Sequence, residues 1–499
     1  MSSGQLPGSE QVDTETRIVE THISILFFLG DRVYKLKKAV RTGFLDWSTP
    51  ERRHEACVLE VALNRRLAPD VYLGVWDVVD ADGERRDALV VMRRLPSSRS
   101  LSRLVRQGAD VRPGLRSLAR QLAAFHAQCR HSPDVADAGR PEAVLRNWRD
   151  NCDEMAAFAV EGLLDPDTLE AVGRLSESYL RAHSRLFERR LEAGRVRDGH
   201  GDLLADDIFL LDDGSRVLDC LEFDPRLRYG DVLADVAFLA MDLERLGAGV
   251  PAASFLSWYL EFSGDNWPAS LAHHWIAYRA LVRAKVACLR HHDGDAGAAA
   301  QASELLALCH RHLRRATVRL VLVGGLPGTG KTTTANGLAD RLGWTLLGSD
   351  ELRHQLEPPS GPGVSGYREG LYRPEITAAV YRGLLDQTGR CLENGENVIV
   401  DASWTDSRWR QEAAAVANRH EAVLVEIECV APSEVAERRI QNRSQDGVGL
   451  SDATPAIARH MAADANPWPT AHQLWCASGP QRALCSALTM ACPDWTDDL

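Results

Sequence analysis

Three aspartates, Asp202, Asp207 and Asp219, flank an apolar stretch that turns back on itself. The segment HGDLLADDIFLLDDGSRVLDCLEFD, from residue 200, holds two apolar runs separated by a DDGS turn. An antiparallel hairpin returns the chain to its starting point, so we expect the three carboxylates to converge. Clustered carboxylates repel one another unless a divalent cation lies between them. This pattern offers what phosphoryl transfer to a hydroxyl needs: oxygen ligands for Mg²⁺ and a carboxylate near the hydroxyl.

A second pattern lies about a hundred residues further along, in GGLPGTGKTTT. It fits GxxxxGKT, with an apolar strand predicted before it and a helix after it, and this context is typical of a phosphate-binding loop. The loop comprises Gly325, Leu326, Pro327, Gly328, Thr329, Gly330, Lys331, Thr332 and Thr333. Backbone N–H groups of such a loop surround phosphates. Lys331 is expected to reach the β- and γ-phosphates, and the Thr332 hydroxyl to bind Mg²⁺.

Acidic residues follow two further apolar runs. Asp350 and Arg353 lie in LLGSDELRHQL, just after a short predicted strand. There Asp350 would act as a base on a substrate hydroxyl, and Arg353 would hold a substrate anion. A helix N-cap with surface charges is the alternative interpretation. Asp401 ends the run VIVD and is expected to orient Mg²⁺ through water.

Three arginines, Arg438, Arg439 and Arg443, share a predicted helix that contains AERRIQNR. Arginines on a mobile helix can fold over a transferring phosphate and stabilise its charge. We therefore consider them candidate lid residues. A solvated helix face explains the same charges equally well.

Lysine is rare in this chain, since only five of the 58 basic residues are Lys. Two of the five, Lys35 and Lys37 in RVYKLKK, fall on one face of a predicted strand, so they compete for the role of a phosphate-gripping cation. Glu60 in the following helix is the expected ion-pair partner, and Glu55 is a weaker candidate. An exposed edge strand with protective lysines is the alternative interpretation.

The elements that position these residues form two groups. Strands are predicted within 18–36, a helix at 51–68 and a hairpin at 71–79 and 87–95, followed by mainly helical sequence to about residue 195. A β-rich lobe and a helical lobe therefore come first. After residue 316, apolar strands alternate with helices, which predicts a parallel α/β sheet. We place the domains at 1–316 and 317–499.

Composition limits the class of protein. The chain has 499 residues, enough for two or more domains, and a formal net charge of −12. This charge argues against binding to nucleic acid or to anionic membranes. No apolar run approaches the roughly 18–20 residues of a membrane helix. The polar, acidic start is unlike a signal peptide, and the eleven cysteines lack a CxxC pair, so we expect reduced thiols and a cytoplasmic location.

The motifs resemble two known families. HGDLxxxDI followed by VLDCLEFD resembles the aminoglycoside phosphotransferase superfamily, which is kinase-like. GLPGTGKT and its surroundings resemble small P-loop kinases such as gluconate kinase, adenylylsulfate kinase, chloramphenicol phosphotransferase and the zeta-toxin type. Over roughly residues 15–480, the whole order of motifs is similar to a bacterial two-domain family that joins an aminoglycoside-phosphotransferase-like domain to a P-loop, ATP-binding domain.

This resemblance implies an α+β kinase-like first domain, a P-loop second domain, and roles for individual residues. Asp202 would be the catalytic base and Asp219 a metal ligand, while Lys35 and Glu60 would position the nucleotide. The stretch VMRRLP at 91–96 would lie beside the adenine. The chain departs from the family in two places: Asp207 stands where the family has Asn, and no Gly-rich loop precedes Lys35.

The leading hypothesis is a phosphotransferase that uses ATP and Mg²⁺ to phosphorylate a hydroxyl of a small polar metabolite, with one nucleotide site per domain. The alternative is a regulatory ATP-binding protein, in which the first domain is a degenerate kinase and only the P-loop domain hydrolyses ATP. A third hypothesis is an interaction protein that needs bound nucleotide to fold. The sequence identifies neither the phosphate acceptor nor the oligomeric state.

Overall fold

The structure, a computed structural model, describes residues 15–41, 45–356, 373–446 and 453–493, which form two compact units. The first unit holds the described residues up to Gly173, with Phe187–Trp267 and His274–His312. The second holds Arg174–Leu186, Pro268–His273 and the described residues from Leu313 onward. Most of the acidic start of the chain, residues 1–14, lies outside the described residues.

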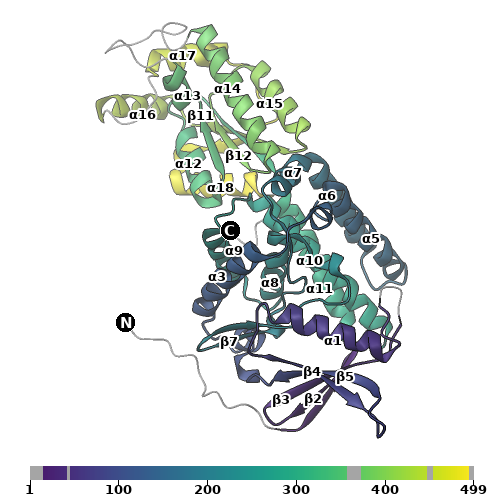
Figure 1. Ribbon diagram of the computed structural model, residues 1–499. Coiled ribbons are helices and arrows are strands. Elements are labelled where there is room, and N and C mark those ends of the chain that lie inside the picture. The colour runs from purple at the N-terminus through teal and green to yellow at the C-terminus, as the bar shows by residue number, and fades with distance from the viewer. Residues whose placement is uncertain (1–14, 42–44, 357–372, 447–452, 494–499) are drawn as a thin grey trace. The chain divides into compact units, whose positions relative to one another are not determined.

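The first unit opens with a five-stranded antiparallel sheet in the order β1-β2-β3-β5-β4. Its strands are β1 (Arg17–Glu20), β2 (Ser24–Leu29), β3 (Arg32–Lys37), β4 (Tyr72–Val79) and β5 (Arg85–Arg93). Helix α1 (Pro50–Asn64) packs on this sheet (Figure 1), and its Cys57 and Val61 join Val33 and Val90 in a buried core. The Thr49 side chain caps α1, so the helix begins where Pro50 fits its first turn.

A mainly helical region follows. Its helices are α2 (Leu101–Arg106), α3 (Arg112–Gln128), α4 (Pro133–Asp137), α5 (Pro141–Val160), α6 (Pro166–Ala182), α7 (Ser184–Glu192), α8 (Val232–Arg245), α9 (Gly249–Ser263), α10 (Ala269–His292) and α11 (Ala298–Ala316). Two small antiparallel pairs lie between α7 and α8: β6 (Val196–Asp198) with β9 (Tyr229–Asp231), and β7 (Ile208–Leu211) with β8 (Gly214–Val217). The predicted hairpin between Asp207 and Asp219 is therefore present as β7 and β8.

The second unit contains a five-stranded parallel sheet in the order β11-β12-β10-β13-β14. The strands are β10 (Arg319–Gly324), β11 (Thr345–Gly348), β12 (Val398–Asp401), β13 (Val423–Val430) and β14 (His472–Trp475). The helices are α12 (Lys331–Leu342), α13 (Ser349–Leu356), α14 (Pro374–Glu393), α15 (Ser407–Arg419), α16 (Ser433–Asp446), α17 (Pro455–Asp464) and α18 (Pro480–Ala491). The sequence patterns did not predict β14.

Helices cover both faces of this parallel sheet (Figure 1). On one face α14 and α15 pack a core that includes Leu384 and Trp409, and on the other α12 and α18 pack a core that includes Leu338 and Ala487. The central strand β10 is buried along its whole length, as expected for a strand covered on both sides.

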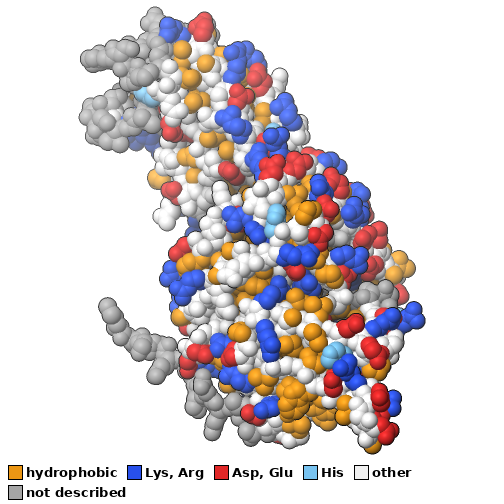
Figure 2. All heavy atoms as spheres, in the orientation of Figure 1, with side chains coloured by type: hydrophobic (Ala, Val, Ile, Leu, Met, Phe, Trp, Pro, Cys, Tyr) orange, Lys and Arg blue, Asp and Glu red, His pale blue; other side chains and the backbone are white. Residues whose placement is uncertain are grey.

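The predicted fold class is confirmed: an α+β unit with a β-rich and a helical part is followed by an α/β unit with a parallel sheet. No helix among the described residues combines the length and apolar character needed to cross a membrane. Basic and acidic side chains are interspersed over the described part of the face shown in Figure 2.

Candidate functional site

The β-rich part of the first unit positions Lys35 between two carboxylates. Its Nζ lies 2.9 Å from Glu60 Oε1 and 2.8 Å from Asp219 Oδ1. Strand β3 supplies the lysine, α1 supplies Glu60, and the segment after β8 supplies Asp219. Burial alone would raise the pKa of Glu60, but Lys35 and Lys37 together hold this pKa below its ordinary value.

Lys37, the other candidate cation, lies deeper. Its side chain is fully buried, and its Nζ is 2.6 Å from Glu60 Oε2 and 2.5 Å from Glu222 Oε1. The ammonium also lies 4.2 Å from the centre of the Trp47 ring, a cation–π contact. Both lysines thus contact Glu60, but only Lys35 contacts Asp219. Glu55, the weaker candidate partner, is exposed on α1.

The HGD triplet forms a loop between β6 and β7. His200 is buried, and its Nε2 lies 3.1 Å from the Leu218 carbonyl oxygen, while the Asp202 N–H donates to its Nδ1 over 3.4 Å. Burial lowers the pKa of His200 to about 4, so the imidazole is neutral at neutral pH. A neutral ring with Nε2 protonated satisfies both contacts, and it joins the loop to the end of the β7–β8 hairpin.

Two buried aspartates of α8 hold the same loop by its backbone. Asp235 accepts hydrogen bonds from the N–H groups of His200 (2.7 Å) and Gly201 (2.8 Å), and from His126 Nε2 (3.0 Å). Asp242 accepts from the Ala205 N–H at 2.9 Å. The sequence patterns predicted no role for these aspartates. Their signal was the pattern DVLADVAFLAMD, where two acidic residues seven positions apart share one face of an apolar helix.

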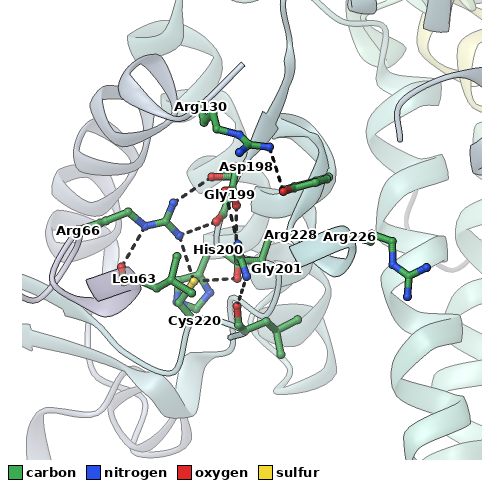
Figure 3. A network of polar contacts seen from close by, with 12 residues as sticks. Leu63, Arg66, Arg130, Asp198, Gly199, His200, Gly201, Cys220, Arg226 and Arg228 are labelled. Atoms are coloured by element: carbon green, nitrogen blue, oxygen red, sulfur yellow. Dashed lines mark hydrogen bonds and ion pairs between the residues drawn. The ribbon is translucent and has the colours of Figure 1, made fainter. Parts of the chain in front are cut away.

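Two arginines hold the segment that leads into the loop, Arg66 by its backbone and Arg228 by the Asp198 side chain, as Figure 3 shows. Arg66 donates to the carbonyl oxygens of Asp198 (3.0 Å) and Gly199 (2.9 Å), and contacts Cys220 Sγ at 3.1 Å. Arg228 donates to the Asp198 carboxylate at 2.8 Å. The loop that carries Asp202 is therefore held from the segment after α1, from α8 and from the segment before β9.

The surroundings of Asp202 raise the pKa of its carboxyl group, as a general base requires. Its side chain is 22% exposed, and Arg283 Nη1 of α10 lies 4.0 Å from its Oδ1. Burial raises the pKa of Asp202 to about 6, Arg283 opposes the rise and the charge of Asp219 adds to it. A carboxylate with a pKa near 6 is ionised at neutral pH yet is a stronger base than an ordinary aspartate.

Asp207 and Asp219 lie at the open end of the β7–β8 hairpin, opposite its turn. The Leu218 N–H donates to the Asp207 carbonyl oxygen at 2.9 Å, which brings the two aspartates to the same end of β7 and β8. Asp219 has a φ of 60°, in the left-handed region, and its N–H donates to Tyr72 Oη at 3.3 Å. A non-glycine residue in this region is strained, and such strain is typical of functional sites.

The charges around Asp207 fit a divalent cation. Burial, together with the negative charges of Asp219 and Asp202, raises the pKa of Asp207 well above its ordinary value. Within the described residues, no three His, Cys, Asp or Glu side chains form a metal-binding group. Mg²⁺ commonly uses one or two protein carboxylates and completes its shell with phosphate oxygens and water. Asp207 and Asp219 match that requirement.

In the second unit, β10 leads into the phosphate-binding loop and α12 leaves it. Gly325 has a φ of 134° and Gly328 a φ of 82°. A Cβ at Gly325 would lie 2.5 Å from the Cys429 carbonyl oxygen, and one at Gly328 would lie 2.4 Å from the Ala436 carbonyl oxygen. Only glycine fits at these two positions. Thr329 Oγ1 donates to the Leu326 carbonyl oxygen at 2.8 Å and so closes the turn.

Asp401 ends β12, beside β10, and faces Lys331 and Thr332. Burial raises the pKa of Asp401, while the charge of Lys331 and a hydrogen bond with Thr332 oppose the rise. In the part of the chain that the structure describes, no hydrogen-bond partner reaches the buried Asp401 Oδ1. An unsatisfied carboxylate oxygen beside Thr332 fits a hydrated Mg²⁺.

A cavity of about 530 Å³ adjoins this loop. Lys331, Asp350 and Arg353 line it, together with the stacked rings of Tyr381 and Trp409, whose centres are 5.0 Å apart. Arg353 donates a hydrogen bond to the Asp350 carboxylate. The structure therefore brings Asp350 and Arg353 to the cavity, within the first turns of α13.

The three candidate lid arginines on α16 have different surroundings. Arg439 donates to the carbonyl oxygens of Gly328 (3.4 Å) and Thr329 (3.3 Å), so it anchors the phosphate-binding loop. Arg438 is exposed. Arg443 is half-buried, and its Nη2 has no hydrogen-bond partner among the described residues.

Comparisons with known proteins give matches to parts of the chain and to most of its length. Residues 320–467 match the family model described as an AAA domain. The solved structures that resemble parts of the chain include a choline/ethanolamine kinase family protein from Mesorhizobium loti, with 14% identity, a TM-score of 0.36, and coverage of 61% of this chain and 94% of that chain. A sugar kinase from Janibacter has 20% identity, a TM-score of 0.27, and coverage of 35% and 94%.

The first unit has the β-rich and helical parts that the sequence predicted, and the second has the predicted parallel sheet, within the residues that match the AAA domain model. Relatives that match most of the chain are also found. The uncharacterized proteins Rv2004c of Mycobacterium tuberculosis and Mb2027c of Mycobacterium bovis are each 39% identical to this chain over 469 residues, which are 93% of this chain and 93% of each relative. The chain therefore belongs to the same family as these two mycobacterial proteins.

Proposed function

We propose that this chain is an ATP-dependent phosphotransferase that phosphorylates a hydroxyl of a small polar metabolite, with one nucleotide site in each unit. The observation that carries the proposal is the joining of Lys35 to Glu60 and Asp219, at 2.9 and 2.8 Å. These residues come from three separate parts of the chain. A lysine fixed by a helix glutamate beside a metal-binding aspartate is the arrangement that kinases use to grip ATP phosphates.

In the proposed mechanism of the first unit, Asp202 accepts or orients the proton of the acceptor hydroxyl. Its pKa of about 6 supports this role. Lys35 holds the α- and β-phosphates, and Glu60 keeps Lys35 in position. Asp207 and Asp219 would hold Mg²⁺, which neutralises charge on the transferring phosphate when bound.

In the second unit, the loop N–H groups and Lys331 would hold the β- and γ-phosphates. Thr332 and Asp401 would hold Mg²⁺, directly and through water. Asp350 would act as the base on an acceptor bound in the 530 Å³ cavity, where Arg353 would bind an anionic group. We propose residues 1–316 and 317–499 as the two catalytic domains, working in the cytoplasm.

A regulatory role for the first unit is the second candidate. Two observations favour it: no Gly-rich loop precedes Lys35, where the chain instead reads ETHISILFFLGDR, and Asp207 stands where the family that the motifs resemble has Asn. In that case the first unit binds ATP without turnover, and the P-loop unit alone hydrolyses it.

The experiment measures ADP release from the purified full chain with Mg²⁺ and a panel of sugars and amino sugars. Asp202→Asn and Lys331→Ala are tested separately, and Asp213→Asn, in the exposed turn between β7 and β8, serves as the matched control. Loss of acceptor-dependent turnover in Asp202→Asn supports the leading proposal. ADP release that needs no acceptor, survives Asp202→Asn and is lost in Lys331→Ala supports the regulatory role instead.

A further inference from the structure

Two cysteines lie next to the phosphate-binding loop, near the ends of neighbouring strands. Cys429 belongs to β13 and pairs in register with Leu474 of β14, and Cys476 follows two residues after Leu474. The side chains of Cys429 and Cys476 are buried, at 1% and 5% exposure. The strand register therefore brings together two thiols that are 47 positions apart in the sequence.

The two thiols share one hydrogen-bonded cluster. Cys429 Sγ lies 3.8 Å from Thr334 Oγ1, and Thr334 Oγ1 lies 4.0 Å from Cys476 Sγ. A hydrogen bond from Cys429 lowers the pKa of Cys476 to about 7; burial opposes this, and Thr334 and Arg439 add to it. The same hydrogen bond, with burial, raises the pKa of Cys429. The cluster thus pairs Cys476, whose thiol ionises readily near neutral pH, with Cys429, whose thiol stays protonated.

Cys476 is also part of the support of the phosphate-binding loop. Arg439 donates to the Cys476 carbonyl oxygen at 2.9 Å, and the same guanidinium donates to the carbonyl oxygens of Gly328 and Thr329. A Cβ at Gly330 would lie 3.3 Å from Cys476 Cβ, so the loop passes close to this residue. A displacement of Cys476 therefore reaches the loop through Arg439 and through Gly330.

We propose that Cys429 and Cys476 form a redox modification site: a peroxide joins them in a disulfide that lowers the affinity of the second unit for ATP. The Cys476 thiolate attacks the O–O bond of hydrogen peroxide and becomes a sulfenic acid, and hydroxide leaves and is protonated to water. The Cys429 thiol then attacks the sulfenic sulfur and releases the second water. Two thiols and one peroxide give one disulfide and two waters.

The disulfide lowers affinity because it moves Cys476 toward Cys429. This movement breaks the contacts of Cys476 with Thr334 and shifts the carbonyl group that holds Arg439. Loop N–H groups bind phosphate well only when they converge on it, so a small displacement of Gly328 or Thr329 weakens several hydrogen bonds at once. The expected loss of ATP affinity is at least about fivefold, the lower end of the coupling seen between linked sites.

The test treats the full chain with hydrogen peroxide, alkylates the remaining thiols and maps disulfides by peptide mass spectrometry. ATP binding is then measured by calorimetry in a Lys35→Met background, which suppresses the first site, before and after dithiothreitol. We expect a Cys429–Cys476 linkage and weaker ATP binding that dithiothreitol restores. Cys429→Ser and Cys476→Ser should each abolish the response, and Cys485→Ser, at the exposed cysteine of α18, should leave it intact.

The linkage itself does not depend on the proposed function, whereas the affinity change rests on the proposed ATP site at Lys331. A reduced protein that binds no ATP while the linkage still forms would count against the proposed function alone. The redox proposal is overturned if peroxide yields no Cys429–Cys476 peptide, or if the linkage forms and ATP affinity stays the same. Should Cys476→Ser fail to fold, Cys429→Ser carries the same test.

Discussion

Replacing Lys37 with Met is expected to destabilise the first unit in a pH-dependent way. Lys37 is fully buried between Glu60 and Glu222, whose side chains are 0% and 7% exposed. In the variant, Glu60 keeps Lys35 at 2.9 Å. Glu222 loses the one cation that contacts it among the described residues. The loss of stability therefore comes mainly from Glu222.

The magnitude follows from the protonation of Glu222. Burial already raises its pKa although Lys37 opposes this, so removal of Lys37 raises the pKa further and the folded variant holds a proton there. Protonating a carboxyl group of ordinary pKa, about 4.3, at pH 7 costs about 4 kcal/mol, which is the upper limit of the loss. The unfolded chain binds fewer protons at Glu222 than the folded variant does. The stability of the variant therefore falls as pH rises, by about 1.4 kcal/mol per pH unit.

The assay is urea unfolding at pH 5.5 and pH 7, read by limited proteolysis and mass spectrometry of peptides from β3 and α1, so that only the first unit is reported. The loss caused by Lys37→Met should be about 2 kcal/mol smaller at pH 5.5 than at pH 7. Adding Glu222→Gln should remove this pH dependence, because glutamine carries no charge to neutralise.

Lys35→Met is the matched control. Glu60 then keeps Lys37, and Asp219, which is 51% exposed, is solvated, so the loss should be below about 1 kcal/mol. ATP binding by the first unit should nevertheless weaken, because Lys35 is the lysine beside Asp219. An equal loss for Lys37→Met at both pH values, or no effect of Glu222→Gln, would refute the assignment of Lys37 as a structural cation.

Three further predictions concern the supports and the base. Acceptor-dependent turnover in the first unit should rise with pH through about 6, because the Asp202 carboxylate must be ionised to accept a proton; a pH–rate profile checks this. Asp235→Asn replaces an acceptor of three hydrogen bonds with a group that also donates, so it should cost about 2–4 kcal/mol and increase hydrogen exchange at residues 199–205. Arg439→Ala should weaken ATP binding by the second unit in calorimetry, whereas Arg438→Ala, at an exposed position of the same helix, should not.

The sequence predicted the parts of the fold that depend on local pattern. Alternation predicted the strands that carry Lys35 and the hairpin between Asp207 and Asp219, and GxxxxGKT with its flanking elements predicted the loop at Lys331. It missed β14, whose four residues HQLW have only one buried side chain and so show no apolar run. Short strands at the edge of a sheet are positioned by their neighbours rather than by their own composition.

The sequence could not separate Lys35 from Lys37, because strand alternation places both on one face. The difference arises from the segment that follows β8, in which Asp219 contacts Lys35 and Glu222 contacts Lys37. Both carboxylates are more than 180 positions away from these lysines in the sequence. Asp235 and Asp242 escaped prediction for the same reason, as did the contacts of Arg439 with the phosphate-binding loop. Each binds the backbone of a distant loop, and a carbonyl or N–H group leaves no trace in the identity of the residue that carries it.

These supports bear on whether the first unit is a degenerate kinase. Asp235 and Asp242 are 4% and 1% exposed, and they accept hydrogen bonds from the backbone of the loop that carries Asp202. Replacing either aspartate by an apolar residue would leave buried backbone N–H groups without an acceptor, so both are needed for this conformation of the loop. Their hydrogen bonds fix the loop that carries Asp202, and a fixed base is a requirement of proton transfer rather than of nucleotide binding. The fixed position of this loop therefore supports the proposed turnover at Asp202, even though no Gly-rich loop precedes Lys35.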